Sequence, residues 1–493
     1  MKKNKLVSAL LVSSIAFCSS IAIAQEEQPK SGLSPNTAKA IVETISILNG
    51  LYVDPVPAKD FEDKIISGIL SKFDSHSSYL DSEELKSFSE EMSGQYAGLG
   101  MTAKKPLSPN YGVKIEELLA EGPAAKAGLK ESDIIIKAGD KELRGTLSEN
   151  IKHLKGKPGT IVKITYIRNG QIFETKVVRN FIPTKSVFGE FCQCNGANSF
   201  FLKVVSFNEQ TGNEAIELLS KNLDKNPKAI IIDLKDNPGG MLQASVELSA
   251  LFLKRGSNVV STKERGTEQI YLKVDPESTG DVFWNKRQEI LSKYPSLLNI
   301  PIYVMINTGS ASASEIVAAS LKDNNRATLI GEKTFGKGSV QKMVPLSNGG
   351  AIKVTIARYY TPSGKTIQAD GVKPNIEVVD DRPWRLSLLE LQKKKYLEKI
   401  PNSFEREADL PGHLTAKYKT NSELIKDFEN KISEDNVYLE KSEPYEKRFS
   451  YSPISKDGKM DSITLKTVNE ILNKSKEALK SGAKEKNKEA NSW

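Results

Sequence analysis

The fold of this chain is decided by the apolar run Ile302-Tyr303-Val304-Met305-Ile306 and by the segment after it, Gly309-Ser310-Ala311-Ser312-Ala313-Ser314-Glu315-Ile316. The run is typical of a buried strand, and the segment predicts a tight turn followed by the start of a helix. A serine at such a turn is exposed at the end of the strand, beside the positive end of the helix dipole. Strands and helices alternate over residues 183–380, and this alternation predicts an α/β core.

A lysine lies between two glycines 25 residues after Ser312, in the segment Thr334-Phe335-Gly336-Lys337-Gly338-Ser339-Val340-Gln341. Its neighbours Phe335 and Val340 predict a tight, apolar surrounding. Desolvation there disfavours the ammonium form and yields a neutral amine that can take a proton from a serine. The two segments together predict a nucleophile and a general base without a histidine.

A third segment, Ile230-Ile231-Ile232-Asp233-Leu234-Lys235-Asp236-Asn237-Pro238-Gly239-Gly240, is another buried strand that runs into a turn. Its two glycines let backbone N–H groups approach a ligand closely, as an oxyanion hole requires. Taken singly, each segment is more typical of an ordinary cap or a solvated turn. The three in this order favour a catalytic site.

The three segments resemble the signatures of the carboxyl-terminal processing (tail-specific) protease family, which are Asp-Leu-Arg-x-Asn-Pro-Gly-Gly, Ser-Ala-Ser-Ala-Ser-Glu-Ile and Thr-Phe-Gly-Lys-Gly-x-Val-Gln. The resemblance extends over roughly residues 40–380. It implies that Ser312 is the nucleophile of a serine endopeptidase, that Lys337 is the general base, and that Gln341 holds the lysine amine in place. It also implies a mixed protease core of the crotonase/Clp-protease type.

The same resemblance implies that the oxyanion is bound by the backbone N–H of Ala313 and of Gly239 or Gly240. The residues alone leave Ser310 and Ser314 as alternatives to Ser312, and only the family's 25-residue spacing selects Ser312. One position departs from the pattern: Lys235 stands where the family usually has arginine, which weakens any bidentate contact expected there.

Residues 96–182 are predicted to be a β-rich domain that resembles a PDZ domain. The resemblance rests on the loop Gly98-Leu99-Gly100-Met101 and on Pro123-Ala124-Ala125-Lys126-Ala127-Gly128-Leu129, with Asp133-Ile134-Ile135 after it. Such a loop presents N–H groups to a terminal carboxylate, while an added strand supplies backbone affinity. The expected partners are therefore protein substrates with apolar or disordered carboxyl termini.

Both ends of the chain differ from this middle part. Residues 1–24 combine a basic start, an apolar stretch and a small-x-small site, which predicts a signal peptide cleaved after Ala24 and export to the periplasm. A retained anchor is the alternative, and membrane association is expected only in that case. Residues 25–95 are predicted to form an N-terminal helical region, and residues 381–493 a charged C-terminal extension.

The composition and one further motif exclude nucleic-acid binding and nucleotide binding. The 493 residues are 38% hydrophobic and 27% charged, as in an ordinary globular protein. The net charge of +8 is spread over many lysines mixed with acids, so no nucleic-acid partner is expected. Gly338 occupies the position where a phosphate-binding loop carries the hydroxyl that holds Mg²⁺, and a strand pattern follows it, so nucleotide binding is rejected.

No metal or other cofactor is expected, because the three histidines, His76, His153 and His413, lie in no cluster of carboxylates or cysteines. Cys192 and Cys194 are compatible with free thiols or with a local disulfide. Two rival functions stay open at this point. One is a secreted PDZ adaptor with an inert protease-like core, and the other is a Ser-His-Asp protease that uses His76.

Overall fold

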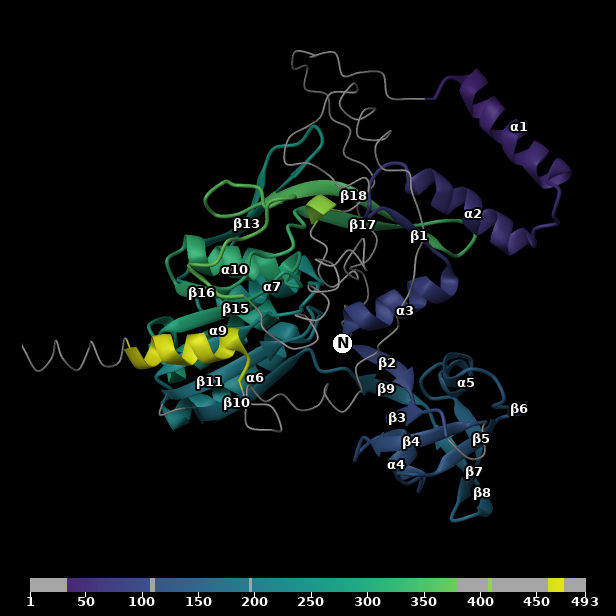
Figure 1. Ribbon diagram of the computed structural model, residues 1–493, viewed down its shortest axis with the longest axis horizontal. Helices are drawn as coiled ribbons and strands as arrows, with labels where there is room; N and C mark the ends of the chain where they lie inside the picture. The colour runs from purple at the N-terminus through teal and green to yellow at the C-terminus, as the bar shows by residue number, and fades with distance from the viewer. Residues whose placement is uncertain (1–32, 107–110, 195–196, 380–406, 410–459, 474–493) are drawn as a thin grey trace, which may run out of the picture. The chain divides into compact units, whose positions relative to one another are not determined.

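The computed structural model describes residues 33–106, 111–194, 197–379, 407–409 and 460–473 (Figure 1). The chain divides into two compact units, residues 1–65 and 66–493. The predicted signal peptide and most of the charged extension lie outside the described residues. Within the described ranges, no helix has the length and apolar character needed to cross a bilayer.

The N-terminal region is mainly helical, as predicted, with α1 (Pro35–Leu51), α2 (Ala58–Leu70) and α3 (Ser82–Ser93). A short strand that the helical pattern did not predict, β1 (Ser78–Leu80), precedes α3 and pairs antiparallel with a strand more than 270 residues later. Helix α3 starts there because the Asp81 side chain accepts hydrogen bonds from the N–H groups of Glu83 and Glu84.

The predicted β-rich domain has its own sheet and its own core. The sheet strands are β3 (Met101–Lys104), β4 (Val113–Leu118), β5 (Ile134–Ala138), β6 (Lys141–Glu142), β7 (Ile161–Arg168) and β8 (Gln171–Val178), with the helices α4 (Pro123–Lys126) and α5 (Leu147–Leu154). Alternate residues of β7, such as Val162 and Ile164, are buried in this core. A separate ribbon of β2 (Gln95–Gly98) and β9 (Asn180–Pro183) joins the two ends of the domain.

The protease-like core is built on a six-stranded sheet in the order β10-β11-β12-β15-β16-β19. Its strands are β10 (Val187–Cys194), β11 (Ala197–Val204), β12 (Ala229–Asp233), β15 (Ile302–Ile306), β16 (Ala327–Gly331) and β19 (Ile376–Glu377). From β11 onward the strands are parallel. Every residue of β12 and β15 is buried, which explains their continuous apolar sequences. Cys192 in β10 is disulfide-bonded.

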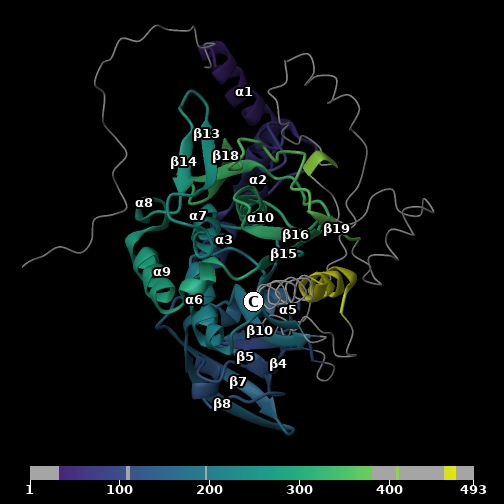
Figure 2. The same ribbon diagram turned by 90° about the vertical axis from the view of Figure 1, so that its left-hand side faces the viewer.

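Helices cover both faces of this sheet (Figure 2). One face packs against α6 (Thr211–Asn222), α7 (Leu242–Ala250) and α10 (Ala313–Asp323), with the short η1 (Leu223–Lys225) after α6. The other face packs against a helix over residues 462–473, through Ile463, Val468 and Ile471. The charged extension therefore supplies one layer of the core, which the sequence did not predict.

A second, antiparallel sheet has the order β1-β18-β13-β14, with β17 also paired to β18. Its longer strands are β13 (Asn258–Glu264), β14 (Ile270–Lys273), β17 (Ser339–Pro345) and β18 (Ala351–Tyr360). The strand predicted after Gly338 is thus present. After the β13–β14 hairpin, the chain continues as α8 (Pro276–Thr279), α9 (Asp281–Lys293) and η2 (Pro295–Leu298).

The three signature segments follow the carboxyl ends of three neighbouring strands of the parallel sheet, β12, β15 and β16. Asp233 pairs with Met305, and Ile306 pairs with Gly331, so the three strands end at nearly the same level. In open α/β sheets, loops at this edge form the ligand-binding crevice. The register of these strands therefore brings together the three loops that carry Gly239, Ser312 and Lys337.

Candidate active site

Ser312 lies at the turn between β15 and α10 in a strained backbone conformation. Its φ and ψ are 54° and −114°, a region that costs a non-glycine residue about 1–3 kcal/mol. Its N–H donates to the Glu315 carboxylate at 2.8 Å, which holds the turn in this form. The side chain is partly exposed at the positive end of α10.

The two neighbouring serines have different surroundings. Ser310 is fully buried, donates its hydroxyl to the Leu234 carbonyl at 2.8 Å, and accepts the N–H of Asn307. Ser314 is also fully buried and donates to the Asn237 carbonyl at 2.9 Å. The Ser312 hydroxyl, by contrast, donates to no described residue. Of the three serines, Ser312 alone is partly exposed, and it alone donates its hydroxyl proton to no acceptor within that part of the chain.

Lys337 lies in the loop between β16 and β17, which is bonded to the serine turn through the Phe335 N–H and the Ser310 carbonyl at 3.0 Å. Burial lowers the pKa of Lys337, and the charge of Lys353 lowers it further. The carboxylates of Glu407, Glu315 and Asp74 oppose these effects. Within the described chain, its amine makes no hydrogen bond.

Gln341 is on β17, directly after a register shift between Val340 and Gln341. Its amide nitrogen donates to Ser339 Oγ at 2.9 Å and to Thr355 Oγ1 at 3.2 Å. The expected bond to the lysine amine is not among the contacts between described residues. Two hydroxyls hold the amide, and its carbonyl oxygen bonds to no other described residue.

The glycine loop after β12 lies against the serine turn. A Cβ at Gly239 would lie 2.8 Å from Ser312 Cβ and 2.9 Å from the Ala313 nitrogen, so only glycine fits there. The Gly239 N–H donates to Asn237 Oδ1 at 2.9 Å. The N–H groups of Gly240 and Ala313 bond to no other described residue.

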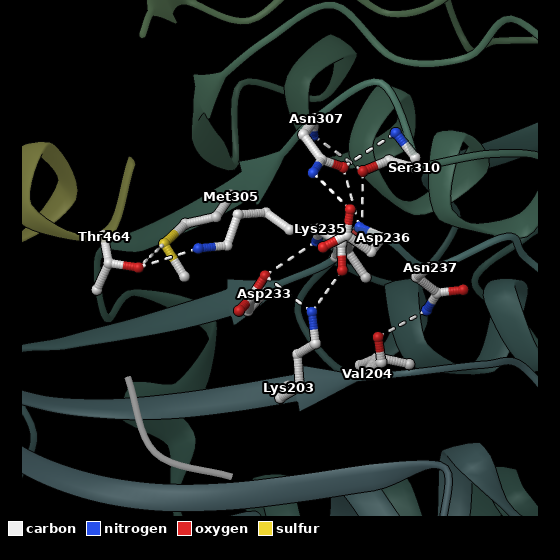
Figure 3. A network of polar contacts seen from close by, with 12 residues as sticks. Lys203, Val204, Asp233, Lys235, Asp236, Asn237, Met305, Asn307, Ser310 and Thr464 are labelled. Carbon is white, nitrogen blue, oxygen red and sulfur yellow. Dashed lines mark hydrogen bonds and ion pairs between the residues drawn. The ribbon is translucent and has the colours of Figure 1, made fainter. Parts of the chain in front are cut away.

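Lys235, the departure from the family pattern, is tied to the C-terminal helix (Figure 3). Its ammonium donates to Asp461 Oδ2 at 2.6 Å and to Thr464 Oγ1 at 3.1 Å, with 6% of the lysine side chain exposed. Lys203 donates to the Lys235 carbonyl and lies 3.3 Å from Asp233. Lys235 therefore joins the segment that follows β12 to residues 461–473.

Replacing Lys235 with methionine is expected to lower the free energy of unfolding by about 2–3 kcal/mol, because it leaves the Asp461 carboxylate partly buried without its cation. Urea unfolding measures this effect. Lys235→Arg, which restores the family residue, is expected to lie within about 1 kcal/mol of the parent, since it keeps the charge. The control is Lys466→Met, which breaks the more exposed Lys466–Glu470 pair of the same helix and should cost only about 0.3–0.5 kcal/mol. Equal losses for Lys235→Met and Lys466→Met would show that the Lys235 contact is not structural.

His76 contacts a residue that sequence reasoning did not single out. Its Nε2 lies 2.5 Å from Glu407 Oε2, and Glu407 is fully buried. The other oxygen of Glu407 accepts from Gln368, whose own oxygen accepts the Gly338 N–H at 2.8 Å. His76 thus supports the lysine loop, and no described hydrogen bond joins it to Ser312. A lone glutamate far from the three signature segments gives no local signal by which the sequence could have revealed it.

The candidate peptide loop connects β2 to β3. The Leu99 and Gly100 carbonyls accept from Ala124 and Leu119 at 2.8 and 2.9 Å, and the Leu99 side chain is buried. In a trans peptide the N–H points away from the C=O. The N–H groups of Gly100 and Met101 therefore face away from the domain interior, at the free edge of β3.

Three comparisons place the chain among known proteins. A model described as Peptidase family S41 matches residues 200–378, and a PDZ domain model matches residues 91–178. The chain is 34% identical over 377 residues to the Carboxy-terminal-processing protease of Bartonella bacilliformis, which covers 74% of this chain and 81% of that protein. It is 31% identical over 326 residues to the Carboxy-terminal processing protease CtpA of Bacillus subtilis, 65% of each.

Among solved structures, the chain is similar to a photosystem II D1 C-terminal processing protease. The TM-score is 0.39 at 22% identity, over 69% of this chain and 92% of that one. The mixed α/β fold with a PDZ domain, predicted from the sequence, is confirmed.

Proposed function

Because the chain belongs to the carboxy-terminal-processing protease family, peptidase family S41, and is a serine-type peptidase, we propose that it is an exported endopeptidase with a Ser312–Lys337 dyad. It recognises the carboxyl ends of its protein substrates through the PDZ domain. Export rests on residues 1–24, and the first residue of the mature protein, expected to be Gln25, tests it.

One observation carries the dyad: Ser312 is the exposed serine of its turn, and the loop bonded to that turn holds a lysine whose pKa is lowered by burial. A neutral amine beside a free hydroxyl is the arrangement that activates a serine without histidine. The test is whether turnover of a disordered protein depends on both Ser312 and Lys337.

In the proposed reaction, Ser312 Oγ attacks the scissile carbonyl carbon while the Lys337 amine takes the hydroxyl proton. The tetrahedral intermediate collapses to an acyl-enzyme, and the lysine returns the proton to the leaving amine nitrogen. Water then attacks the ester carbonyl and gives a proton to the lysine. The lysine passes this proton to Ser312 Oγ as the ester C–O bond breaks and the new carboxyl end leaves.

Two backbone groups support the assignment of the oxyanion hole. The N–H of Ala313 begins α10, where the helix dipole favours negative charge. Of the two glycines, Gly240 is favoured over Gly239, because the Gly239 N–H already donates to Asn237. The role of Gly239 would then be steric, because the absence of a side chain lets its loop approach Ser312.

Amidating the carboxyl end of a test substrate is expected to slow its cleavage about 10- to 100-fold, although the scissile bond lies elsewhere. The outward N–H groups of Gly100 and Met101 would lose a charged acceptor, and hydrogen bonds to charged groups contribute about 1.5–3 kcal/mol. Placing a charged last residue should slow cleavage as well. The measurement is the ratio of cleavage rates for free and amidated ends.

The control is the same ratio in a chain that lacks residues 96–182, because the deletion removes the domain proposed to bind the carboxyl end of the substrate. The ratio should then approach one, whatever happens to the basal rate. A ratio of one in the full chain would show that the PDZ domain does not read the terminal carboxylate.

A further inference from the structure

Ser312 and Lys337 lie on loops that follow different strands, β15 and β16. Neither a helix nor a strand therefore fixes the distance between them. Misplacing reacting groups by about 1 Å can cost a factor of about 100 in rate. Something besides the two loops must set their separation, and two buried side chains contact both residues.

The first side chain is Glu315, on the first turn of α10. Its Oε2 atom accepts the backbone N–H of Ser312 and the backbone N–H of Lys337, each at 2.8 Å. Its Oε1 atom accepts the Thr334 hydroxyl at 2.5 Å and the Gly336 N–H at 2.7 Å. One carboxylate thus bonds the serine turn, Lys337 itself and two residues that precede it, Thr334 and Gly336.

All four partners of Glu315 donate. The Thr334 hydroxyl accepts the Val372 N–H at 2.7 Å, which directs its own hydrogen toward Glu315. An amide of the same shape would turn an NH₂ group toward at least one of these donors. The position therefore needs a carboxylate, even though burial raises the pKa of Glu315 to about 7.

The second side chain is Tyr359, on β18, with 1% of its surface exposed. Its hydroxyl donates to the Lys337 carbonyl and lies 3.2 Å from the Ser312 carbonyl. Burial raises the pKa of Tyr359 well above its ordinary value, so the hydroxyl keeps its proton at neutral pH. The backbone N–H groups of Ser312 and Lys337 thus donate to Glu315, and the carbonyl groups of the same two residues lie against the Tyr359 hydroxyl.

We propose that Glu315 and Tyr359 are positioning residues that form a clamp, which sets the distance from the Ser312 hydroxyl to the Lys337 amine. This inference rests on the proposed dyad. Neither side chain reacts with substrate. Each acts through the backbone of the two residues that do, and the two together fix both ends of each residue.

The test uses Tyr359→Phe and Glu315→Gln in the full chain, with Tyr360→Phe and Glu247→Gln as controls. Tyr360 is the next residue of β18, and Glu247 on α7 is a second carboxylate whose pKa burial raises to about 7. We expect kcat of each clamp variant to fall about 10- to 100-fold with KM within about twofold of the parent, because substrate contacts are unchanged. Both controls should keep the parent kcat.

A second readout separates the clamp from general stability. A fluorophosphonate reacts with activated serine hydroxyls and is expected to label Ser312 without needing a peptide substrate. Its labelling rate should fall in the clamp variants by a factor similar to the fall in kcat, at temperatures well below each variant's Tm. The double variant should lose little more than the worse single variant, because the two groups hold the same pair.

Tyr359→Phe keeps the shape of the ring and decides the matter even if Glu315→Gln does not fold. Parent kcat and parent labelling rate in a folded Tyr359→Phe would overturn the clamp. If the parent protein itself is not labelled at Ser312, the dyad fails instead, so the two failures are distinguishable. A loss confined to KM would also overturn the proposal.

Discussion

Ser312→Ala is expected to remove hydrolysis of a disordered protein, with a loss in kcat of at least about 1000-fold and with folding intact. The reason is geometric as well as chemical. Ser312 is the partly exposed serine of the turn, its hydroxyl donates to no described residue, and the Ala313 N–H lies beside it at the start of α10. Without the hydroxyl no acyl-enzyme forms, and only weak catalysis by the remaining groups is left. Mass spectrometry of the products measures the loss.

Ser310→Ala and Ser314→Ala are the matched controls in the same turn. Both should retain activity, because their hydroxyls are buried and donate to the carbonyls of Leu234 and Asn237. Each should instead lower the free energy of unfolding by about 1 kcal/mol through a lost hydrogen bond. Cleavage by Ser312→Ala at the parent rate would show that the nucleophile lies elsewhere, and mapping the labelled serine would then identify it.

The strand, turn and helix around Ser312 were predictable because a short apolar run followed by small residues is typical of a buried strand that ends in a tight turn. Strand β15 has the predicted bounds, Ile302–Ile306. Helix α10 begins at Ala313, within the segment predicted to hold a turn and a helix start, and ends at Asp323. Burial on both faces of a parallel sheet requires such continuous apolar runs.

The parts that the sequence did not predict depend on contacts distant in the chain. Strand β1 has only three residues and exists because it pairs with β18. The helix over residues 462–473 had a usable signal in the spacing of Ile463, Val468 and Ile471, but the surrounding lysines and glutamates obscured it. No sequence pattern indicated that Glu407 contacts His76, because a single residue forms no motif and no periodicity.

The candidate site, like the fold, was predictable from the sequence only in part. The signature segments identified which residues would gather, because each follows a parallel strand. They did not reveal what holds these residues in place. Glu315 belongs to the quoted serine segment, yet its position there indicated only the start of a helix. Its bonds to the Lys337 loop depend on the register of β15 against β16, which periodicity does not specify.

Lys337→Arg is expected to be as inactive as Lys337→Ala, with kcat lowered at least about 1000-fold. A general base must be neutral in part of the population, and a guanidinium stays charged at every pH at which proteins are folded. Burial and the nearby Lys353 lower the pKa of the Lys337 amine. The neutral fraction therefore grows as pH rises through this lowered pKa, and the parent rate should rise over the same interval and then level off.

The matched control is Lys342→Arg, since Lys342 is an exposed lysine of β17, five residues further on. It should keep the parent rate and the parent pH profile. If Lys337→Arg turned over substrate appreciably at any pH, a neutral lysine could not be the base. His76 would then be the residue to test, because its Nε2 already contacts the buried carboxylate of Glu407 and a carboxylate-oriented histidine is the usual alternative base. Inactivity of both Lys337 variants with full activity of His76→Ala would leave the lysine as the base.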